Sequence, residues 1–341
     1  MRAITLPRTG VETTALGFGC AELYRAPSAA RRRRLLEVAY GVGIRHFDLA
    51  PMYGLGLAER ELGQFSRGRR DRIVIATKFG ISPTAAARAL ARVQAPMRRV
   101  LSASPALRQR ARSSAAGPAS GRAGALLYSS TGYDAASARA SLERSLEQLG
   151  TDYVDLLLLH DPEPGNVRSD EVCGYLEEAR RAGRIRAWGV AGEPEPSLRV
   201  ARSLLAGNPV LQVRDDIQLR SLSGVPTESF PARITFGVLG RALRPIVAHI
   251  TAQAERQRQW SEAVGKDCGN PETIASLLLR HALRANPTGV VLFSTIRTDH
   301  MRSGAAVAAS PGDAPAPDLD AFVRLVDTEL RKIPSIPETD D

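Results

Sequence analysis

The chain has 341 residues, a formal net charge of +10 and three cysteines. This length suits one barrel enzyme with insertions, and we expect a single domain over residues 1–341. The sequence contains no apolar run of about eighteen residues, which argues against a transmembrane helix, and its first residues lack the apolar core of a secretory signal. Three widely spaced cysteines favour neither a disulfide framework nor a zinc site, so we expect a cytoplasmic protein without a bound metal.

The positive charge comes almost entirely from arginine. It indicates either a nucleic-acid surface or an arginine-rich composition with solvated helix faces. Arg31–Arg34 begin a helical pattern in which no aromatic residues interleave with the charges, and this favours the second interpretation. We therefore expect no nucleic-acid or membrane partner, although a basic field suits an anionic substrate or a phosphate-bearing cofactor.

Eight short apolar runs have the composition of β-strands. They cover 14–19, 44–50, 72–78, 153–160, 185–191, 210–215, 232–237 and 289–294. Helical patterns separate most of them, at 29–41, 57–66, 137–149, 169–182, 195–206 and 271–284. Ser28 and Ser137 precede two of these patterns as candidate N-caps, and Gly150 follows one as a stop signal.

The alternation of strands and helices predicts an α/β fold with a parallel sheet. Eight strands fit a closed (β/α)8 TIM barrel better than the alternative, an open doubly wound sheet. No predicted strand is followed by the complete GxGxxG turn that a dinucleotide-binding open sheet would carry.

Four segments stand outside this alternation. Residues 81–132 are rich in Ala, Arg, Ser and Pro and follow a strand, so they form an insertion at the barrel mouth that is either a lid or partly disordered. Residues 303–318 are expected to be a surface linker, residues 318–332 a last helix, and residues 333–341 a loose tail.

Four polar side chains lie at or just beyond predicted strand ends: Asp48, Tyr53, Lys78 and His160. Strand C-termini meet at one mouth in a barrel, so these residues are expected to meet there. A buried lysine needs a partner, which Asp48 can provide. The ammonium would favour ionisation of the phenol, and the histidine could orient a carbonyl. This set is suited to proton transfer during hydride transfer to or from carbon.

The flanking residues resemble the aldo-keto reductases. The segment GIRHFDLAPMYGLGLAERELG is similar to that family's first signature, ATKFG to its lysine strand, and SLERSLEQLGTDYVDLLLLHDP to its histidine signature. The resemblance implies a (β/α)8 barrel that binds an extended nicotinamide cofactor. It makes Tyr53 the general acid/base, with Asp48, Lys78 and His160 as its supports, and it places Asp48 near the cofactor as well.

The resemblance also implies a nicotinamide site, where this chain departs from the family pattern. Ala191 and Gly192 stand where the family has a serine and an asparagine that hold the carboxamide. Gln212 matches the family's carboxamide-binding glutamine. Phe236 matches the aromatic residue that stacks on the nicotinamide ring, with ordinary core packing as the alternative.

Phosphate-binding positions follow from the same resemblance. Leu239 and Arg241 match the pyrophosphate loop. The residues that match the adenosine-phosphate segment are Ser294, Thr295, Arg297 and His300. Arg297 can form a bidentate pair with a 2′-phosphate, which favours NADP over NAD, and a plain surface arginine is the alternative.

These observations predict an NADP(H)-dependent oxidoreductase that acts on a small-molecule carbonyl or alcohol. One alternative is a dehydrogenase of sugar hemiacetals. Another is a cofactor-binding regulatory protein with weak catalysis, which the replacements at Ala191 and Gly192 keep open. Tyr24 and Trp188 are candidate pocket residues, with core packing an equal alternative for Trp188. The substrate, the reaction direction and the oligomeric state are not encoded in any pattern that we recognise.

Overall fold

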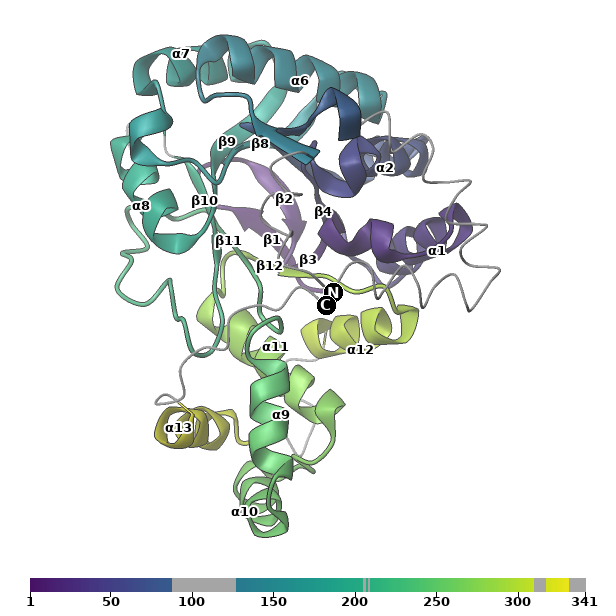
Figure 1. Cartoon of the computed structure of the whole chain (residues 1–341), viewed down its shortest axis with the longest axis vertical. Coiled ribbons are helices and arrows are strands. Elements are labelled where there is room, and N and C mark those ends of the chain that lie inside the picture. The colour runs from purple at the N-terminus through teal and green to yellow at the C-terminus, as the bar shows by residue number, and fades with distance from the viewer. Residues whose placement is uncertain (88–126, 205–206, 208, 310–316, 331–341) are drawn as a thin grey trace.

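The computed structural model describes residues 1–87, 127–204, 207, 209–309 and 317–330. Eight parallel strands close into a barrel with the neighbour order β3-β4-β5-β8-β9-β10-β11-β12, and β12 pairs with β3. This confirms the (β/α)8 TIM barrel, and the closed order excludes the open doubly wound sheet. Figure 1 shows helices around the barrel.

All eight predicted strands are present. They are β3 (Leu16–Gly19), β4 (His46–Asp48), β5 (Val74–Phe79), β8 (Val154–His160), β9 (Ile185–Gly192), β10 (Val210–Arg214), β11 (Arg233–Phe236) and β12 (Val290–Phe293). Nearly every residue in them is buried, because a strand of a parallel barrel has the interior on one face and helices on the other.

The predicted helices are present too. They are α1 (Ala29–Gly41), α2 (Ala58–Ser66), α6 (Ala135–Leu149), α7 (Ser169–Arg181), α8 (Pro194–Ser203) and α11 (Pro271–Ala285). Ser28 caps α1, since its hydroxyl accepts from the Arg31 N–H at 3.2 Å. The prediction that Ser137 caps α6 is wrong: Asp134 is the N-cap, and its carboxylate accepts from the Ser137 N–H at 2.8 Å.

A hairpin that the sequence analysis did not identify closes one end of the barrel. Strands β1 (Ala3–Leu6) and β2 (Val11–Thr14) pair antiparallel. Leu6 and Val11 are fully buried and belong to the same apolar cluster as the inward-facing residues of the strands. The hairpin therefore completes the inner core, while a second, larger core lies between the strands and the helices.

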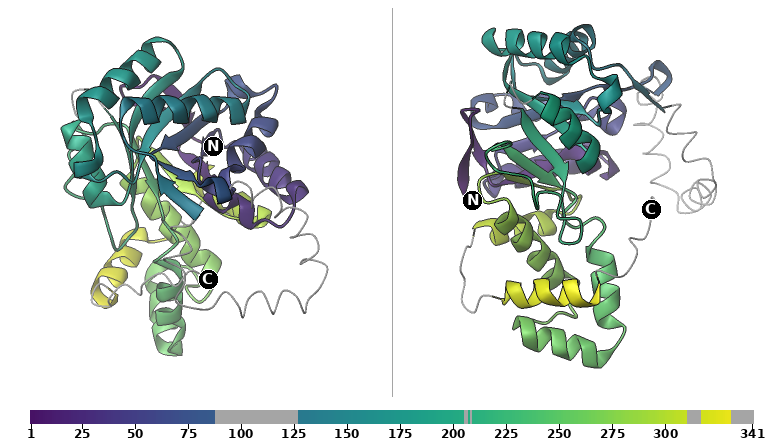
Figure 2. Two further views of the ribbon diagram at one scale, coloured as in Figure 1. Left: turned by 45° about the horizontal axis from the view of Figure 1, so that its top comes forward. Right: turned by 90° about the vertical axis from the view of Figure 1, so that its left-hand side faces the viewer.

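Three further helices form a group beside the barrel, seen below it in Figures 1 and 2: α9 (Leu243–Thr251), α10 (Ala254–Val264) and α13 (Leu319–Glu329). Trp260 is fully buried there and packs edge-on against Phe322 at 6.0 Å. Glu329 accepts from the Trp260 indole at 3.2 Å and lies 2.7 Å from the His249 imidazole. The last predicted helix is thus present as α13.

The segments outside the alternation need two corrections. Residues 303–309 are not linker but the end of α12 (Thr298–Ala309). Gly304 and Ala305 are buried there, and a Cβ at Gly304 would lie 3.3 Å from the Phe293 ring of β12. The ends of the 81–132 insertion pair as β6 (Ile81–Pro83) and β7 (Tyr128–Ser130). The centre of that insertion and the 333–341 tail lie outside the described residues.

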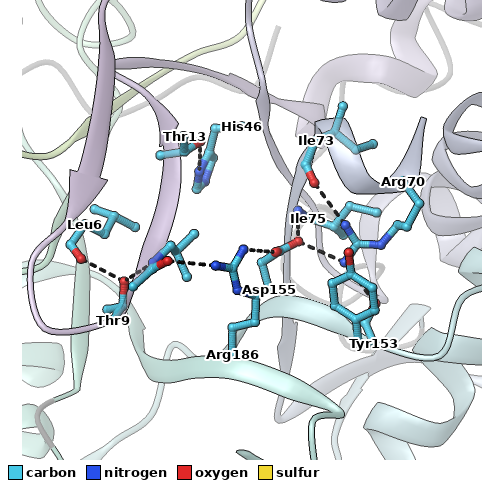
Figure 3. A network of polar contacts seen from close by, with 12 residues as sticks. Leu6, Thr9, Thr13, His46, Arg70, Ile73, Ile75, Tyr153, Asp155 and Arg186 are labelled. Carbon is cyan, nitrogen blue, oxygen red and sulfur yellow. Dashed lines mark hydrogen bonds and ion pairs between the residues drawn. The ribbon is translucent and has the colours of Figure 1, made fainter.

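A buried ionic network ties the hairpin to the barrel at the end away from the strand C-termini (Figure 3). Asp155 is 1% exposed and accepts from Arg70 at 2.9 Å, Arg186 at 3.2 Å and the Ile75 N–H at 2.9 Å. Arg186 also donates to the Gly10 carbonyl of the hairpin at 2.7 Å. Three strands and the hairpin therefore depend on one carboxylate.

His46 lies inside the barrel and is fully buried. Its Nδ1 is 3.4 Å from the Thr13 hydroxyl, as Figure 3 shows. Burial, with a smaller contribution from the charge of Lys78, lowers the pKa of His46 to about 3. The folded protein therefore holds a neutral imidazole at this position.

His46 should make the fold sensitive to acid. The unfolded chain protonates this imidazole below pH ~6.5, whereas the folded chain does so only near its pKa of about 3. The free energy of unfolding should therefore fall as the pH drops from 6.5 towards 3, by about 1.4 kcal/mol per pH unit. Urea titrations at pH 7.5 and pH 5 measure this change. The decrease in the free energy of unfolding between the two pH values should be roughly 2 kcal/mol smaller for His46→Gln than for the wild type. Identical losses in the two proteins would contradict this assignment.

Candidate active site

The four strand-end residues predicted to meet do lie together. Asp48 ends β4, Lys78 lies near the end of β5, and His160 ends β8. Tyr53 begins the short helix η2 (Tyr53–Gly56) that follows β4. All four line one cavity at the strand C-termini, where barrel enzymes carry their active sites.

Lys78 is the centre of this group. Its side chain is 2% exposed, and its Nζ donates to Asp48 Oδ1 at 2.7 Å and to the Leu49 carbonyl at 2.7 Å. Its third neighbour is the Tyr53 hydroxyl, at 3.5 Å. Burial acts to lower the pKa of Lys78, but attraction to Asp48 and Tyr53 outweighs it, so the pKa lies above its usual value. The site therefore contains a fixed ammonium in contact with a phenol.

Tyr53 and His160 are neighbouring rings that line the cavity. Their rings meet edge-on, with centroids 6.0 Å apart. Burial raises the pKa of Tyr53, and although Lys78 acts to lower it, as the sequence predicts, the phenol remains protonated at neutral pH. Burial, assisted by the charge of Lys78, lowers the pKa of His160 to about 3. The pair is thus a neutral phenol and a neutral imidazole.

The cavity has a volume of about 640 Å³. Six residues predicted from the cofactor resemblance line it together with the four above: Ala191, Gly192, Gln212, Phe236, Leu239 and Ser294. Residues from all eight strands of the barrel therefore line this cavity.

Gln212 tests whether this wall suits a carboxamide-bearing cofactor. Its side chain is 2% exposed and lines the cavity, yet its Oε1 has no hydrogen-bond partner among the described residues. A buried amide oxygen without a partner costs about 1–3 kcal/mol, which a donor from a bound molecule would offset. The residues present therefore fit a group that offers an N–H at this point.

Four predicted phosphate-binding residues lie outside this cavity lining. Arg241 is half-buried in the turn between β11 and α9, and Thr295 follows β12. Arg297 is 58% exposed and forms a bidentate pair with Asp299, just before the N-terminus of α12. His300 lines a neighbouring cavity of about 150 Å³, which shares Leu239 and Phe293 with the main one.

Comparison with known proteins agrees with the geometry. The sequence model of the Aldo/keto reductase family matches residues 15–223. The chain belongs to this family. It is 33% identical over 187 residues to a D-threo-aldose 1-dehydrogenase from a Pseudomonas species, a match that covers 53% of this chain and 50% of the relative. The chain thus spans about half the length of that curated relative.

Solved structures of aldo-keto reductases share the fold over nearly the whole chain. One from Bacillus halodurans, in its holo form, aligns with a TM-score of 0.67 and 20% identity, covering 95% of this chain and 96% of that one. One from Klebsiella pneumoniae, in complex with NADPH, has a TM-score of 0.62 and 19% identity, covering 96% of this chain and 95% of that one.

Within the described part of the chain, no helix has the length and apolar character needed to cross a membrane.

The two aromatic residues suggested for the pocket, Tyr24 and Trp188, do not line the cavity that contains Tyr53. Tyr24 packs beneath the Tyr53 loop, where a Cβ at Gly54 would lie 2.4 Å from its ring, and its hydroxyl donates to the Leu57 carbonyl at 3.1 Å. Trp188 is 2% exposed and donates to Glu177 at 2.8 Å, which agrees with the core-packing alternative.

Several charged residues that the sequence analysis missed also line the cavity. They are Glu22, Arg25, Asp161, Glu193, Arg214 and Arg244. Asp161, Glu193 and Arg214 could have been found by the rule that revealed the first four, because each follows or ends a barrel strand. The others come from connecting segments, where the sequence carries no comparable signal.

Proposed function

We propose that this protein is an NADP(H)-dependent oxidoreductase that interconverts a carbonyl and an alcohol. The observation that carries the proposal is the contact of one buried ammonium with both a carboxylate and a phenol at the wall of a cavity. Proton transfer to or from oxygen is the task that such a group performs best.

The four side chains divide the work during carbonyl reduction. Tyr53 donates its phenolic proton to the carbonyl oxygen. Lys78, at 3.5 Å from that phenol, stabilises the phenolate that forms, and Asp48 keeps the ammonium in place. His160 holds the carbonyl oxygen with a neutral imidazole. In alcohol oxidation the same groups act in reverse, with the phenolate as base.

A bound nicotinamide cofactor would supply or accept the hydride. Gln212 would hold the carboxamide, which gives its buried Oε1 a partner, and Phe236 would form the wall against the ring. Ala191 and Gly192 carry no side-chain donors, so we assign them only backbone contacts. Leu239 and Arg241 would lie along the diphosphate, and Ser294 near the adenosine phosphate.

Replacement of Tyr53 by Phe tests the acid/base role. The variant keeps the ring but lacks the proton, so reduction of carbonyl substrates with NADPH should fall by about 10²- to 10⁴-fold. The Kd for NADPH, measured by fluorescence, should stay within about threefold of the wild-type value, since the substitution removes only the phenolic hydroxyl. Tyr153→Phe, at the opposite end of the barrel, is the matched control.

The outcome separates the enzyme from the regulatory alternative. If the wild type binds NADPH but reduces no member of a broad carbonyl panel, a cofactor-binding protein with weak catalysis is the better description. Turnover that survives in Tyr53→Phe would assign the proton transfer to another group.

The preference for NADP over NAD rests on Arg297. This guanidinium is exposed beside the N-terminus of α12, where helix dipole and free N–H groups favour an anion. It is paired with Asp299, so we propose that a 2′-phosphate takes over from that carboxylate. The relative from Klebsiella pneumoniae, whose structure contains NADPH, supports this cofactor.

Arg297→Gln should weaken NADPH binding by about 10-fold or more, because it removes a charge-assisted hydrogen bond. NADH binding should change much less, since NADH lacks the 2′-phosphate. Both affinities can be measured by fluorescence titration, with Arg302→Gln on the same helix as control. Equal losses for the two cofactors would mean that Arg297 does not read the 2′-phosphate.

A sugar hemiacetal dehydrogenase remains the second candidate. The named aldose dehydrogenase relative favours it, although that match covers only half of each protein. The same four side chains would serve, since Tyr53 as phenolate can take the proton of a hemiacetal hydroxyl. Initial rates with NADP⁺ and aldoses, compared with NADPH and simple aldehydes, distinguish the two directions.

A further inference from the structure

Asp161 directly follows the predicted catalytic His160 and has no role so far. Its side chain lines the cavity and is 50% exposed, and its Oδ2 lies 3.7 Å from His160 Nε2. The carboxylate is therefore close to the point where the reacting oxygen would sit between Tyr53 and His160.

The backbone fixes this side chain in position. Asp161 has a φ of 47°, in the left-handed region that aspartate tolerates better than most residues. Its N–H donates to the Ala191 carbonyl at 2.7 Å, and its own carbonyl accepts from the Tyr133 hydroxyl at 3.2 Å. The strained turn is thus held from two sides, and its side chain is directed to the cavity.

Gly192 provides the space for this carboxylate. A Cβ at position 192 would lie 2.3 Å from Asp161 Oδ1, closer than any side chain can approach. Gly192, which departs from the family pattern, therefore leaves the room that the Asp161 carboxylate occupies. A larger residue at 192 would displace the carboxylate from the cavity.

The Asp161 carboxylate accepts a hydrogen bond from the Glu193 N–H and has further lone pairs for a ligand. In the described part of the chain, no lysine or arginine forms an ion pair with it: Lys78 is paired with Asp48, and Arg214 with Glu193 at 2.8 Å. A carboxylate only accepts hydrogen bonds, so its natural neutral partner is a hydroxyl. Its position beside His160 places that hydroxyl next to the reacting carbon.

We propose that Asp161 is a specificity-determining residue that binds a hydroxyl on the carbon adjacent to the reacting carbon. The substrate class is then the α-hydroxy carbonyl compounds and the cyclic hemiacetals that sugars of this kind form. This inference rests on the proposed function and refines it. The chemical step is unchanged: in reduction the carbon gains the hydride from the reduced cofactor, and the oxygen gains the proton of Tyr53.

A pair of substrates that differ by one hydroxyl tests the proposal. The full chain would be assayed with NADPH and either 2-hydroxypropanal or propanal. A hydrogen bond to a charged acceptor predicts that the wild type prefers 2-hydroxypropanal by about 10- to 100-fold in kcat/KM. In Asp161→Ala this ratio should fall to about 1, and in Asp161→Asn it should be intermediate, because the amide oxygen still accepts.

Two further variants control for the fold and the geometry. Gly192→Ala keeps the carboxylate but displaces it, and should also reduce the ratio. Glu163→Gln, an exposed carboxylate two residues further on, should keep the wild-type ratio. A wild type that reduces both aldehydes equally well, or an Asp161→Ala variant that keeps the preference, would overturn the proposal while leaving the proposed function intact. If the wild type reduced neither aldehyde nor any other carbonyl, the proposed function would fail, and this inference with it.

Discussion

The geometry of the candidate site depends on one buried ion pair, Lys78 with Asp48. An ammonium inside a barrel is unfavourable unless it is paired and hydrogen-bonded. Here Asp48 and the Leu49 carbonyl accept two of its protons at 2.7 Å, which leaves the third directed towards Tyr53. The pairing thus stabilises the buried charge and directs it towards Tyr53, where it opposes the rise in the pKa of the phenol that burial causes.

The barrel separates this site from the elements that hold the fold together. The strand C-termini carry the ion pair, the phenol and the cavity, whereas the other end is closed by the N-terminal hairpin. At that end Asp155 is contacted by Arg70 and Arg186. Loss of one partner from such a network leaves an unpaired buried charge, which destabilises the fold. Substitutions around the cavity can therefore alter specificity, as we infer for Asp161, without loosening the hairpin.

The sequence was sufficient for the barrel and for the centre of the candidate site. The strands are short and apolar and alternate with helical patterns, so their succession could be predicted. Polar residues at their ends stand out against the apolar runs. Gln212 lies inside β10 and not at its end, so only the family resemblance identified it. Neither approach found the β1–β2 hairpin, because two short strands with mixed polarity resemble a loop.

Other features could not be predicted because they depend on local backbone geometry or on contacts between distant segments. The capping role of Asp134 depends on where α6 starts, which periodicity alone does not fix. The partner of Arg297 is Asp299, two residues away, and only the turn geometry decides that they pair. The relation between Gly192 and Asp161 appears only when β8 and β9 lie side by side. The resemblance to a family had identified the glycine as a departure without giving its cause.

The most direct test of this account is the rate of hydride transfer in Lys78→Met, measured in a single turnover with NADPH. Without the ammonium the phenolate of Tyr53 loses its stabilising charge, so the rate should fall by about 10²-fold or more, while NADPH still binds. The double variant Lys78→Met/Asp48→Asn, which leaves no unpaired buried carboxylate, should be folded and equally slow. A Lys78→Met protein that transfers hydride at nearly the wild-type rate would contradict the central role of the ion pair.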